Sequence, residues 1–415
     1  MRLAYALFIV GSFWSGQASA QNPPPFQPLV DAAPEGGVLR PAPGVYAGPA
    51  TIGKAMTIDG GGSVTITGNG LGTVVTLTGR QIVLQGLKIR DSGHRHENLD
   101  ACLRLEGASF NVVKDNDLAG CLVGIDVNRA DRNIFRRNRI QGLEPASDMR
   151  GDGLRVWYSN DNIFERNTII DHRDFILEYS TRNVLTGNKI TNGRYGTHFM
   201  YASGNVARDN VYENNEVGIF SMYASHLCLV GNSVLNSNGP SGFGLGFKEA
   251  GNLTVENNRI LGNAIGIYLD DSPSDTDQVN TFRNNRIGFN GVAIQFHSSG
   301  EGNKFGGNSF YGNYTDVAAH GGAAAASAVW DGNSWDAYQG FDRSGRGVGD
   351  TPFEVYAYAD RIWADLPMAS YFRGSPLFES IDFLTRLAPF SKPQLILRDE
   401  RPATRPIVDG PATCG

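Results

Sequence analysis

The amino-acid sequence predicts an all-β protein, a right-handed parallel β-helix with a C-terminal cap and a short helical tail. A short phrase recurs nine times: an apolar residue, an asparagine three residues later and another apolar residue two after that. A period near 22 residues with strand-like alternation, many Gly and Asn residues and little helical pattern is typical of a solenoid. The nine asparagines are Asn116, Asn138, Asn167, Asn188, Asn210, Asn232, Asn258, Asn285 and Asn308.

A coil of about 22 residues accommodates three short strands and three bends, with one side of each strand facing a shared interior. Coils stack ~4.8 Å apart, so residues at one phase lie above each other. Because Asn tolerates left-handed backbone conformations, we expect the nine asparagines to be bend residues that form a structural ladder. A leucine-rich repeat would need a helical half-repeat, which the sequence lacks. The alternation places Phe199 and Phe247 inside.

The N-terminal segment predicts export. Arg2 precedes an apolar run from Leu3 to Trp14, and Ala18-Ser19-Ala20 follows. This is the pattern of a signal peptide cleaved after Ala20, too short to span a membrane, so we expect a periplasmic protein that is not itself transmembrane. A net charge of −6 and a pI near 5.7 argue against a nucleic-acid partner.

We expect three segments: a signal peptide (1–20), the β-helix with an N-terminal cap (21–329), and a C-terminal cap with a partner-docking tail (330–415). In the tail, Ile381, Leu384 and Leu387 have helical spacing, which predicts a stretch that either covers the open end or docks on a partner. The run 342–350 resembles a calcium-binding loop, but Ser344 and Arg346 stand where acidic ligands belong. Calcium is therefore only weakly supported.

Four cysteines in an exported protein suggest disulfides. Cys102 and Cys121 lie on adjacent coils but about three residues out of register, so we expect that a bond between them would require a backbone shift. Cys228 sits beside the apolar Leu229 and is assigned to the core, and Cys414 lies in a Pro-rich tail. The disulfide state stays open.

A second strand in each coil begins near a glycine, and its second and fourth residues should point outward. Exposed Trp, Phe, Met and Ile residues on one face of a polar solenoid predict a contact surface. The second positions are Asp126, Arg155, Ile176, His198, Phe220, Gly246, Tyr268 and Gln295, and the fourth are Asn128, Trp157, Glu178, Met200, Met222, Lys248, Asp270 and His297.

Three residues of this face have the chemistry of a copper site. His198 and Met200 share one outward strand face, and Met222 lies one coil further on. Thioether and imidazole ligands suit Cu(I). The alternative is that the methionines pack against an aromatic neighbour and the histidine is merely exposed. The pair His94 and His96 on a loop is a weaker metal candidate.

Several segments resemble the NosD family, periplasmic β-helical accessory proteins of nitrous oxide reductase. The resemblance covers nearly the whole chain after residue 20 and is most specific in the coil 193–201. The segments are 151–159 (GDGLRVWYS), 193–201 (GRYGTHFMY), 218–223 (GIFSMY), 330–335 (WDGNSW), 349–352 (GDTP) and 387–391 (LAPFS).

The resemblance implies an assembly factor for the reductase's copper-sulfur centre, working with a membrane ABC transporter and a copper-delivering lipoprotein. It implies transient Cu(I) binding, which we place at His198, Met200 and Met222. Residues expected to contact partners are Trp157, Glu178, Phe220, Lys248, Ile381, Leu384 and Leu387. The family pattern prefers an aromatic residue where Glu178 stands, so the role of Glu178 is open.

The competing interpretation is an enzyme. Parallel β-helices also host uronan lyases, epimerases and hydrolases, which use carboxylates with Arg or Lys on an outer strand face. Asp126, Asp152 and Asp174 could supply the carboxylates, and Arg155 and Lys248 the cations. The face from Ile176 to Met222 lacks the long polar groove that a charged polysaccharide needs, so we favour the non-enzymatic assembly role.

Overall fold

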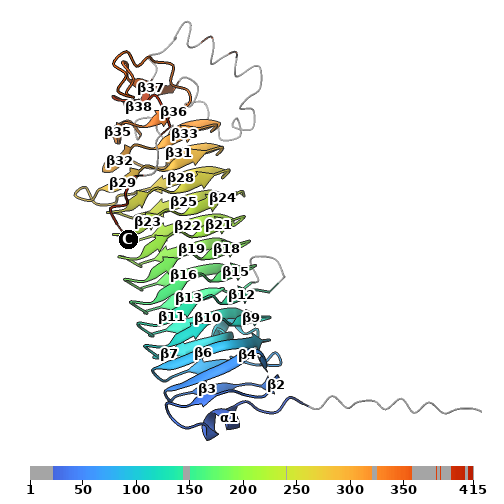
Figure 1. The fold of residues 1–415 in the computed structure, drawn as a ribbon. Helices are drawn as coiled ribbons and strands as arrows, with labels where there is room; N and C mark the ends of the chain where they lie inside the picture. Colours follow the sequence, from blue (N-terminus) through green and yellow to red (C-terminus); the bar gives the residue numbers. More distant parts are fainter. Residues whose placement is uncertain are drawn as a thin grey trace, which may run out of the picture.

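The computed structural model describes residues 22–143, 150–239, 241–319, 325–357, 380, 384, 394–406 and 410–414. The chain forms a right-handed parallel β-helix that stands as a tall column (Figure 1), which confirms the predicted fold class. Sheet B contains one strand from each coil and has 12 strands, whereas sheet A forms two flanks joined by the long early strands and has 26. The described part of the chain therefore forms about twelve coils.

The strands of sheet B pair in parallel in chain order. They are β3 (Ala50–Ile52), β5 (Val75–Leu77), β7 (Ala101–Glu106), β10 (Val123–Asn128), β13 (Leu154–Trp157), β16 (Asp174–Glu178), β19 (Tyr195–Met200), β22 (Val217–Met222), β25 (Phe243–Lys248), β28 (Ile265–Asp270), β31 (Val292–Phe296) and β34 (Thr315–Ala319).

The first flank of sheet A follows sheet B in each coil. It comprises β8 (Val112–Lys114), β11 (Ile134–Arg136), β14 (Ile163–Glu165), β17 (Val184–Thr186), β20 (Val206–Arg208), β23 (Cys228–Val230), β26 (Thr254–Glu256), β29 (Asn280–Arg283), β32 (Asn303–Gly306) and β35 (Val329–Asp331). The second flank comprises β9 (Asp117–Ala119), β12 (Arg139–Gln141), β15 (Thr168–Ile170), β18 (Lys189–Thr191), β21 (Val211–Glu213), β24 (Ser233–Leu235), β27 (Arg259–Leu261), β30 (Arg286–Gly288), β33 (Ser309–Tyr311) and β36 (Ser334–Trp335).

The remaining elements lie at the two ends and in loops. Near the N-terminus are α1 (Gln27–Ala32), β1 (Val38–Leu39), β2 (Gly44–Ala47), β4 (Met56–Thr67), β6 (Ile82–Arg90) and η1 (His96–Asn98). Near the C-terminus are η3 (Ala325–Ser327) and the antiparallel pair β37 (Phe353–Ala357) and β38 (Gln394–Asp399). β35 and β36 continue sheet A past residue 329. The boundary between the β-helix and the C-terminal cap at that residue therefore stays a prediction.

The predicted asparagine ladder lies between the two flanks of sheet A. Each side-chain amide donates to the side-chain carbonyl of the asparagine one coil further on, at 2.9–3.1 Å. The ladder asparagines themselves do not have positive φ; the residue before each one does, for example Asp115 and Arg137. The structural role is confirmed, but the expected left-handed backbone was wrong, because the buried amide acts by its hydrogen bonds.

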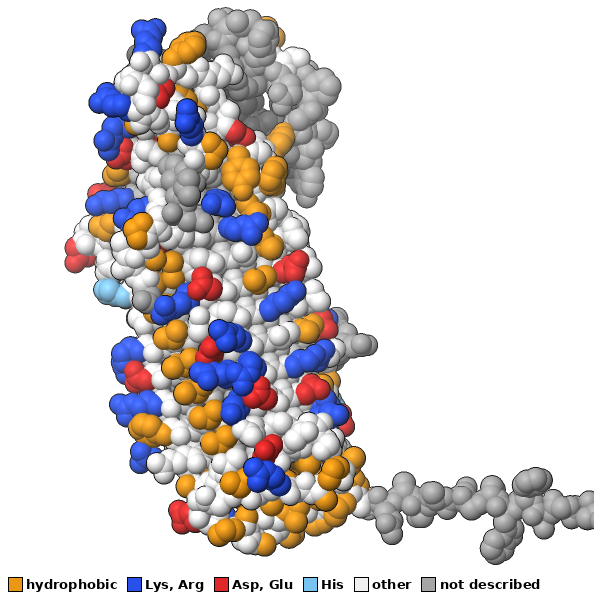
Figure 2. Space-filling view, viewed as in Figure 1, with side chains coloured by type: hydrophobic (Ala, Val, Ile, Leu, Met, Phe, Trp, Pro, Cys, Tyr) orange, Lys and Arg blue, Asp and Glu red, His pale blue; other side chains and the backbone are white. Residues whose placement is uncertain are grey.

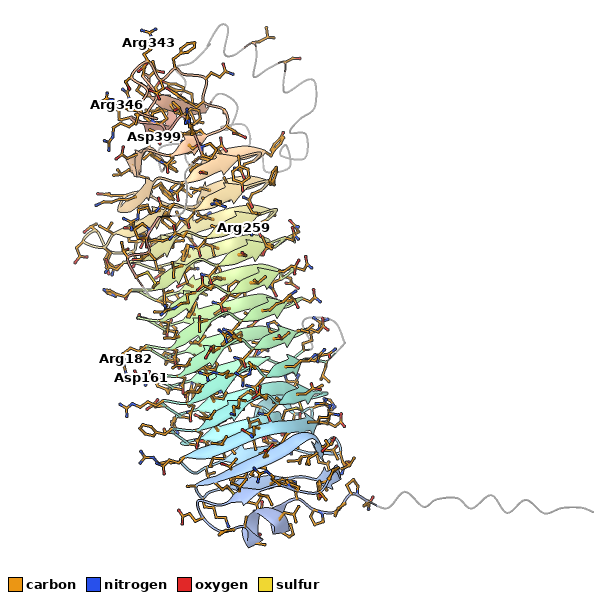
Figure 3. All side chains as sticks on the ribbon, viewed as in Figure 1. Asp161, Arg182, Arg259, Arg343, Arg346 and Asp399 are labelled. Atoms are coloured by element: carbon orange, nitrogen blue, oxygen red, sulfur yellow. A yellow bond between two sulfur atoms is a disulfide. The ribbon has the colours of Figure 1, made fainter. Side chains whose placement is uncertain are left out.

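Both ends of the interior are closed. Phe26, which precedes α1, and Val30 of α1 are buried over the first coils. Trp330 and Trp335 stack on the aromatic side chains of the last coils. Asp399, near the upper end of the column (Figure 3), ends the asparagine ladder. Its buried carboxylate accepts hydrogen bonds from the amide group of Asn333 and from two backbone N–H groups. Phe199 and Phe247 are fully buried, as predicted.

The cysteine expectations were wrong on both counts. Cys102 and Cys121 form a disulfide with a Cα–Cα distance of 5.5 Å. Cys102 is the second residue of β7, level with Gly124 of β10 in the next coil, and its side chain lies in the main core cluster together with that of Cys121.

Cys228 is bonded to Cys414, 186 residues away, with a Cα–Cα distance of 6.0 Å. It is not a core residue: its neighbour Leu229 points inward, so Cys228 points outward. Cys228 is buried nevertheless, because the C-terminal tail returns to the middle coils and covers it.

Acidic and basic side chains are intermixed on the face seen in Figure 2, and many are paired across neighbouring coils. Arg182 and Asp161, which project together from one flank in Figure 3, are 2.7 Å apart. Among the described residues, no helix is long and apolar enough to cross a membrane. Residues 1–20, which contain the predicted signal peptide, lie outside the described ranges.

Candidate functional site

The outer face of sheet B brings the predicted site residues into adjacent rungs. Trp157 pairs with Glu178, Glu178 with Met200, Met200 with Met222, and Met222 with Lys248 in the parallel register. His198 pairs with Phe220. The outward order predicted from the alternation therefore holds in these five coils. Trp157, Glu178, Met200, Met222 and Lys248 are all partly exposed.

His198 differs from its neighbours because it is almost enclosed. Its side chain lies on the outer face, but the residue is only 8% exposed. The ring packs against Tyr195 at 4.9 Å and Phe220 at 5.8 Å between ring centres. Both ring nitrogens are buried and have no hydrogen-bond partner among the described residues.

Burial lowers the pKa of His198, although the nearby Asp174 carboxylate acts in the opposite direction. The imidazole is therefore neutral at pH 7, and it keeps an unprotonated nitrogen that can act as a metal ligand. Buried polar atoms without partners are uncommon and call for an explanation such as a bound ion or water. The donor set of His198, Met200 and Met222 suits a soft cation such as Cu(I).

Phe220 is less accessible than expected. It is 9% exposed because its ring packs against Tyr195 on one side and Phe243 on the other. Gly246, its register partner, makes this possible, since a Cβ atom there would lie 2.4 Å from the Phe220 ring. Phe220 therefore mainly encloses His198 and offers little surface for contact with a partner.

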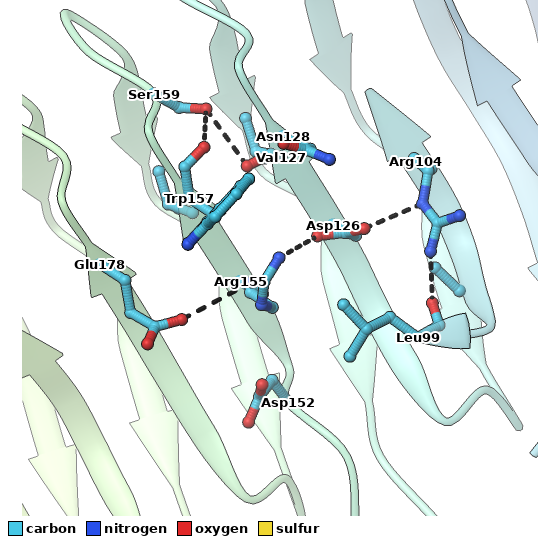
Figure 4. A network of polar contacts seen from close by, with 12 residues as sticks. Leu99, Arg104, Asp126, Val127, Asn128, Asp152, Arg155, Trp157, Ser159 and Glu178 are labelled. Carbon is cyan, nitrogen blue, oxygen red and sulfur yellow. Dashed lines mark hydrogen bonds and ion pairs between the residues drawn. The ribbon is translucent and has the colours of Figure 1, made fainter. Parts of the chain in front are cut away.

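Glu178 ends a chain of ion pairs across four coils (Figure 4). Asp126, which is buried, accepts from Arg104 at 2.9 Å and from Arg155 at 3.2 Å. Arg155 also lies 3.7 Å from the Glu178 carboxylate and over the Trp157 ring. The chain of ion pairs contains two arginines and two carboxylates, so its charges cancel, and Glu178 neutralises the charge of Arg155. At the other side of the methionines, Lys248 lies 3.9 Å from Asp270.

A row of tyrosines beside the methionines was not predicted. Tyr158, Tyr179, Tyr201 and Tyr223 directly follow the four outward residues from Trp157 to Met222 and stack at 4.8–5.2 Å. The first three are 47%, 41% and 42% exposed. The signal was present, since Tyr follows the fourth position in four successive coils, from Trp157 to Met222.

All four tyrosines have positive φ, from 44° to 53°. The residues at the same place in neighbouring coils, Arg129, Glu249 and Asp271, also have positive φ, so this left-handed bend belongs to the repeat and not to the tyrosines. Met200, Met222 and the three tyrosines beside them form one continuous surface of low charge, between Glu178 and Lys248. We call it the Tyr-Met face: Tyr179, Met200, Tyr201, Met222 and Tyr223.

The carboxylates considered for an enzyme are buried and paired. Arg173 makes two bonds to Asp152, at 2.9 and 3.1 Å, and Arg194 makes two to Asp174. Burial raises the pKa of Asp152 to about 6, with the neighbouring Asp174 adding to the rise and Arg173 opposing it. These groups have the arrangement of structural ion pairs at the start of the strands of sheet B.

The remaining candidates are dispersed. His94 and His96 are exposed, and no group of three or more His, Cys, Asp or Glu residues placed to hold a metal occurs in the described part of the chain. In the loop considered for calcium, the Asp342 carboxylate accepts hydrogen bonds from the loop's own backbone at Arg346 and Gly347. Leu384 is 57% exposed, while Ile381 and Leu387 lie outside the described residues.

The chain is similar to several known proteins. A family model described as "Periplasmic copper-binding protein (NosD)" matches residues 143–340, which include the whole Tyr-Met face. A Pseudomonas aeruginosa protein named "Probable ABC transporter binding protein NosD" is 26% identical over 398 residues, covering 88% of this chain and 87% of that protein. A protein of the same name from Stutzerimonas stutzeri is 30% identical over 117 residues, covering 27% and 26%.

Solved structures similar to this chain include the periplasmic alginate epimerase AlgG, with a TM-score of 0.46 and 14% identity over 70% of this chain and 82% of that one. The A-module of the Azotobacter vinelandii mannuronan C-5 epimerase AlgE4 gives 0.45 and 14% over 70% and 91%. The chain is thus similar to NosD proteins over the coils that carry the site and, at 26% identity, over most of its length.

Proposed function

We propose that this protein is a periplasmic assembly factor for the copper-sulfur centre of nitrous oxide reductase, and that it holds Cu(I) transiently at His198, Met200 and Met222. The observation that supports this most is the enclosed, neutral His198 beside a pair of methionines on adjacent rungs. His198 and Met200 are two residues apart on one strand face, which is a distance of about 6.6 Å. The three side chains can therefore converge above one patch of sheet B.

The site is open on one side, which suits transfer of the ion. The imidazole nitrogen is held by the aromatic enclosure, whereas the two methionines are partly exposed. Three ligands on one face leave a position for a ligand from a docked protein. We expect weak binding by this chain alone and tighter binding in a complex with its copper-delivering lipoprotein.

The Tyr-Met face has the composition of a docking surface. Tyr, Trp and Met are enriched at the centres of protein interfaces, where charged residues are depleted. The charges lie at its borders, at Glu178 and Lys248. We propose that the copper-delivering lipoprotein and the reductase use this face in turn. The C-terminal segment around Leu384 is proposed to contact the membrane ABC transporter.

The enzyme interpretation is less well supported. A catalytic carboxylate must reach the substrate proton, but Asp152 and Asp174 are buried under paired arginines. Incubating the protein with polyuronates provides a direct test, and the release of unsaturated or epimerised products would favour the enzyme.

The decisive experiment replaces both methionines of the site by leucine, which keeps size and apolar character while removing the thioethers. The Met200→Leu/Met222→Leu variant should fold normally, lose Cu(I) binding in the presence of the delivery partner and yield reductase without its copper-sulfur centre. Met56→Leu is the matched control, because Met56 is a buried core methionine and should have no effect on copper. Full reductase maturation with the double variant would reject the copper role.

A further inference from the structure

The C-terminal tail is fastened to the side of the solenoid. From Asp399 at the upper end, the chain returns to the middle coils, where its end lies beside them in Figure 1. Gly410 exchanges two hydrogen bonds with the Asn257 side chain. Thr413 donates two, both 2.7 Å, to the carboxylate of Glu256, which is 1% exposed and also pairs with Arg283. The Cys228–Cys414 disulfide adjoins these contacts.

The two disulfides differ in accessibility. Cys102 and Cys121 are both buried in the main core cluster. Cys228 points outward under the tail, and Cys414, on the tail itself, is partly exposed. A dissolved reductant can reach the second disulfide without opening the solenoid, whereas the first requires the interior to open.

The accessible disulfide belongs to the coil of the candidate copper site. Cys228 follows Met222 by six residues and Tyr223 by five, with one bend between them. Four hydrogen bonds close to Cys414 would still hold the tail after the sulfur–sulfur bond is broken. Held in this way, the two thiols keep a high effective concentration relative to each other.

We propose that Cys228 and Cys414, once reduced, form a second Cu(I) site on this chain. An external dithiol transfers two electrons to the Cys228–Cys414 bond and becomes a disulfide itself, leaving two thiols. Cu(I) then binds both sulfurs as thiolates, releases their two protons to solvent and keeps its oxidation state. Thiolates are the soft ligands that select Cu(I), so this site binds more tightly than the methionine pair.

The inference rests on the proposed function only in taking Cu(I) as the ion that this protein meets. The two sites share no ligand, so each can fail alone. The disulfide form leaves only the methionine site, and the reduced form has both. The redox state of the Cys228–Cys414 pair thus sets how much copper the chain retains.

The test uses purified full-length protein under anaerobic conditions. It is treated with a phosphine reductant, desalted, and titrated with Cu(I) against a chromogenic Cu(I) chelator. Native reduction should release two thiols rather than four, and reduced protein should bind one more equivalent of Cu(I) than oxidised protein. X-ray absorption of the added copper should report two sulfur ligands at thiolate distance.

Variants separate this site from the first. Cys228→Ser/Cys414→Ser should lose the additional equivalent, and Met200→Leu/Met222→Leu should retain it. Circular dichroism confirms that each variant is folded. The proposal is overturned if reduction adds no Cu(I), if the cysteine variant binds the additional equivalent, or if the copper has no thiolate ligands; the disulfide is then a structural staple for the tail.

Discussion

The interior and the outer face of sheet B are built from the same strands but obey different constraints. On β19, Phe199 is fully buried and Met200, the next residue, is partly exposed. Inside, each coil supplies apolar side chains of similar kind. Outside, the residue type changes from an ion-pair chain near Asp126 to methionines and tyrosines and then to the Lys248–Asp270 pair. The fold dictates the interior, so the information about function lies in the outer face.

The largest expected effect on the free energy of unfolding comes from a substitution in the interior. Phe199→Ala leaves a cavity in a close-packed interior and should lower the free energy of unfolding by about 4 kcal/mol. Met200→Leu, one residue away, should change it by less than about 1.5 kcal/mol, because it conserves volume on the outer face. Urea unfolding followed by circular dichroism measures both. Equal losses would mean that the assigned inward and outward directions are wrong.

Sequence alone was sufficient wherever contacts follow the period. The stacking of Met200 on Met222 and the asparagine ladder both join residues one coil apart. Such contacts follow from strand alternation and from the spacing of parallel coils, which are local rules. Because every coil follows these rules, the register predicted for one coil can be checked against the next coil.

Contacts outside the period could not be obtained in this way. Cys414 reaches Cys228 across 186 residues by a path that no repeat describes. The enclosure of His198 joins register neighbours, but it depends on the Phe220 ring occupying the space that Gly246 leaves free, which alternation does not predict. Alternation predicted that these outer residues point outward, but their accessibility depends on what their neighbours cover.

One buried histidine of the interior sharpens the comparison through pH. His172 lies in a bend of the interior, fully buried, and burial lowers its pKa to about 4. Its pKa in the unfolded chain is about 6.5, so between pH 6.5 and 4 the unfolded state binds more protons. The full stability is therefore present above pH 6.5 and is lost on acidification through this window, by about 3 kcal/mol at pH 4.

His172→Asn should remove this loss, because asparagine does not titrate and Asn215, two coils further on, occupies a similar bend. The measurement is the difference in urea stability between the variant and the wild type at pH 7 and pH 4. Taking the difference cancels carboxylates common to both proteins, including Asp152, whose raised pKa acts in the opposite direction.

The smallest effect on stability is expected at the border of the Tyr-Met face. Glu178→Gln removes one partner of a 3.7 Å ion pair whose side chains are 15% and 23% exposed, and should change the free energy of unfolding by less than about 1 kcal/mol. Glu165→Gln is the matched control, since Glu165 also pairs with an arginine but lies in sheet A.

Glu178→Gln and Glu165→Gln should differ in their effect on docking, although their effects on stability are similar. A charge at the border of an interface mainly affects the association rate and its dependence on salt. Stopped-flow association with the copper-delivering lipoprotein, at low and physiological salt, should therefore differ from the wild type for Glu178→Gln and not for Glu165→Gln. The same rate for all three proteins would place the docking surface elsewhere on the solenoid.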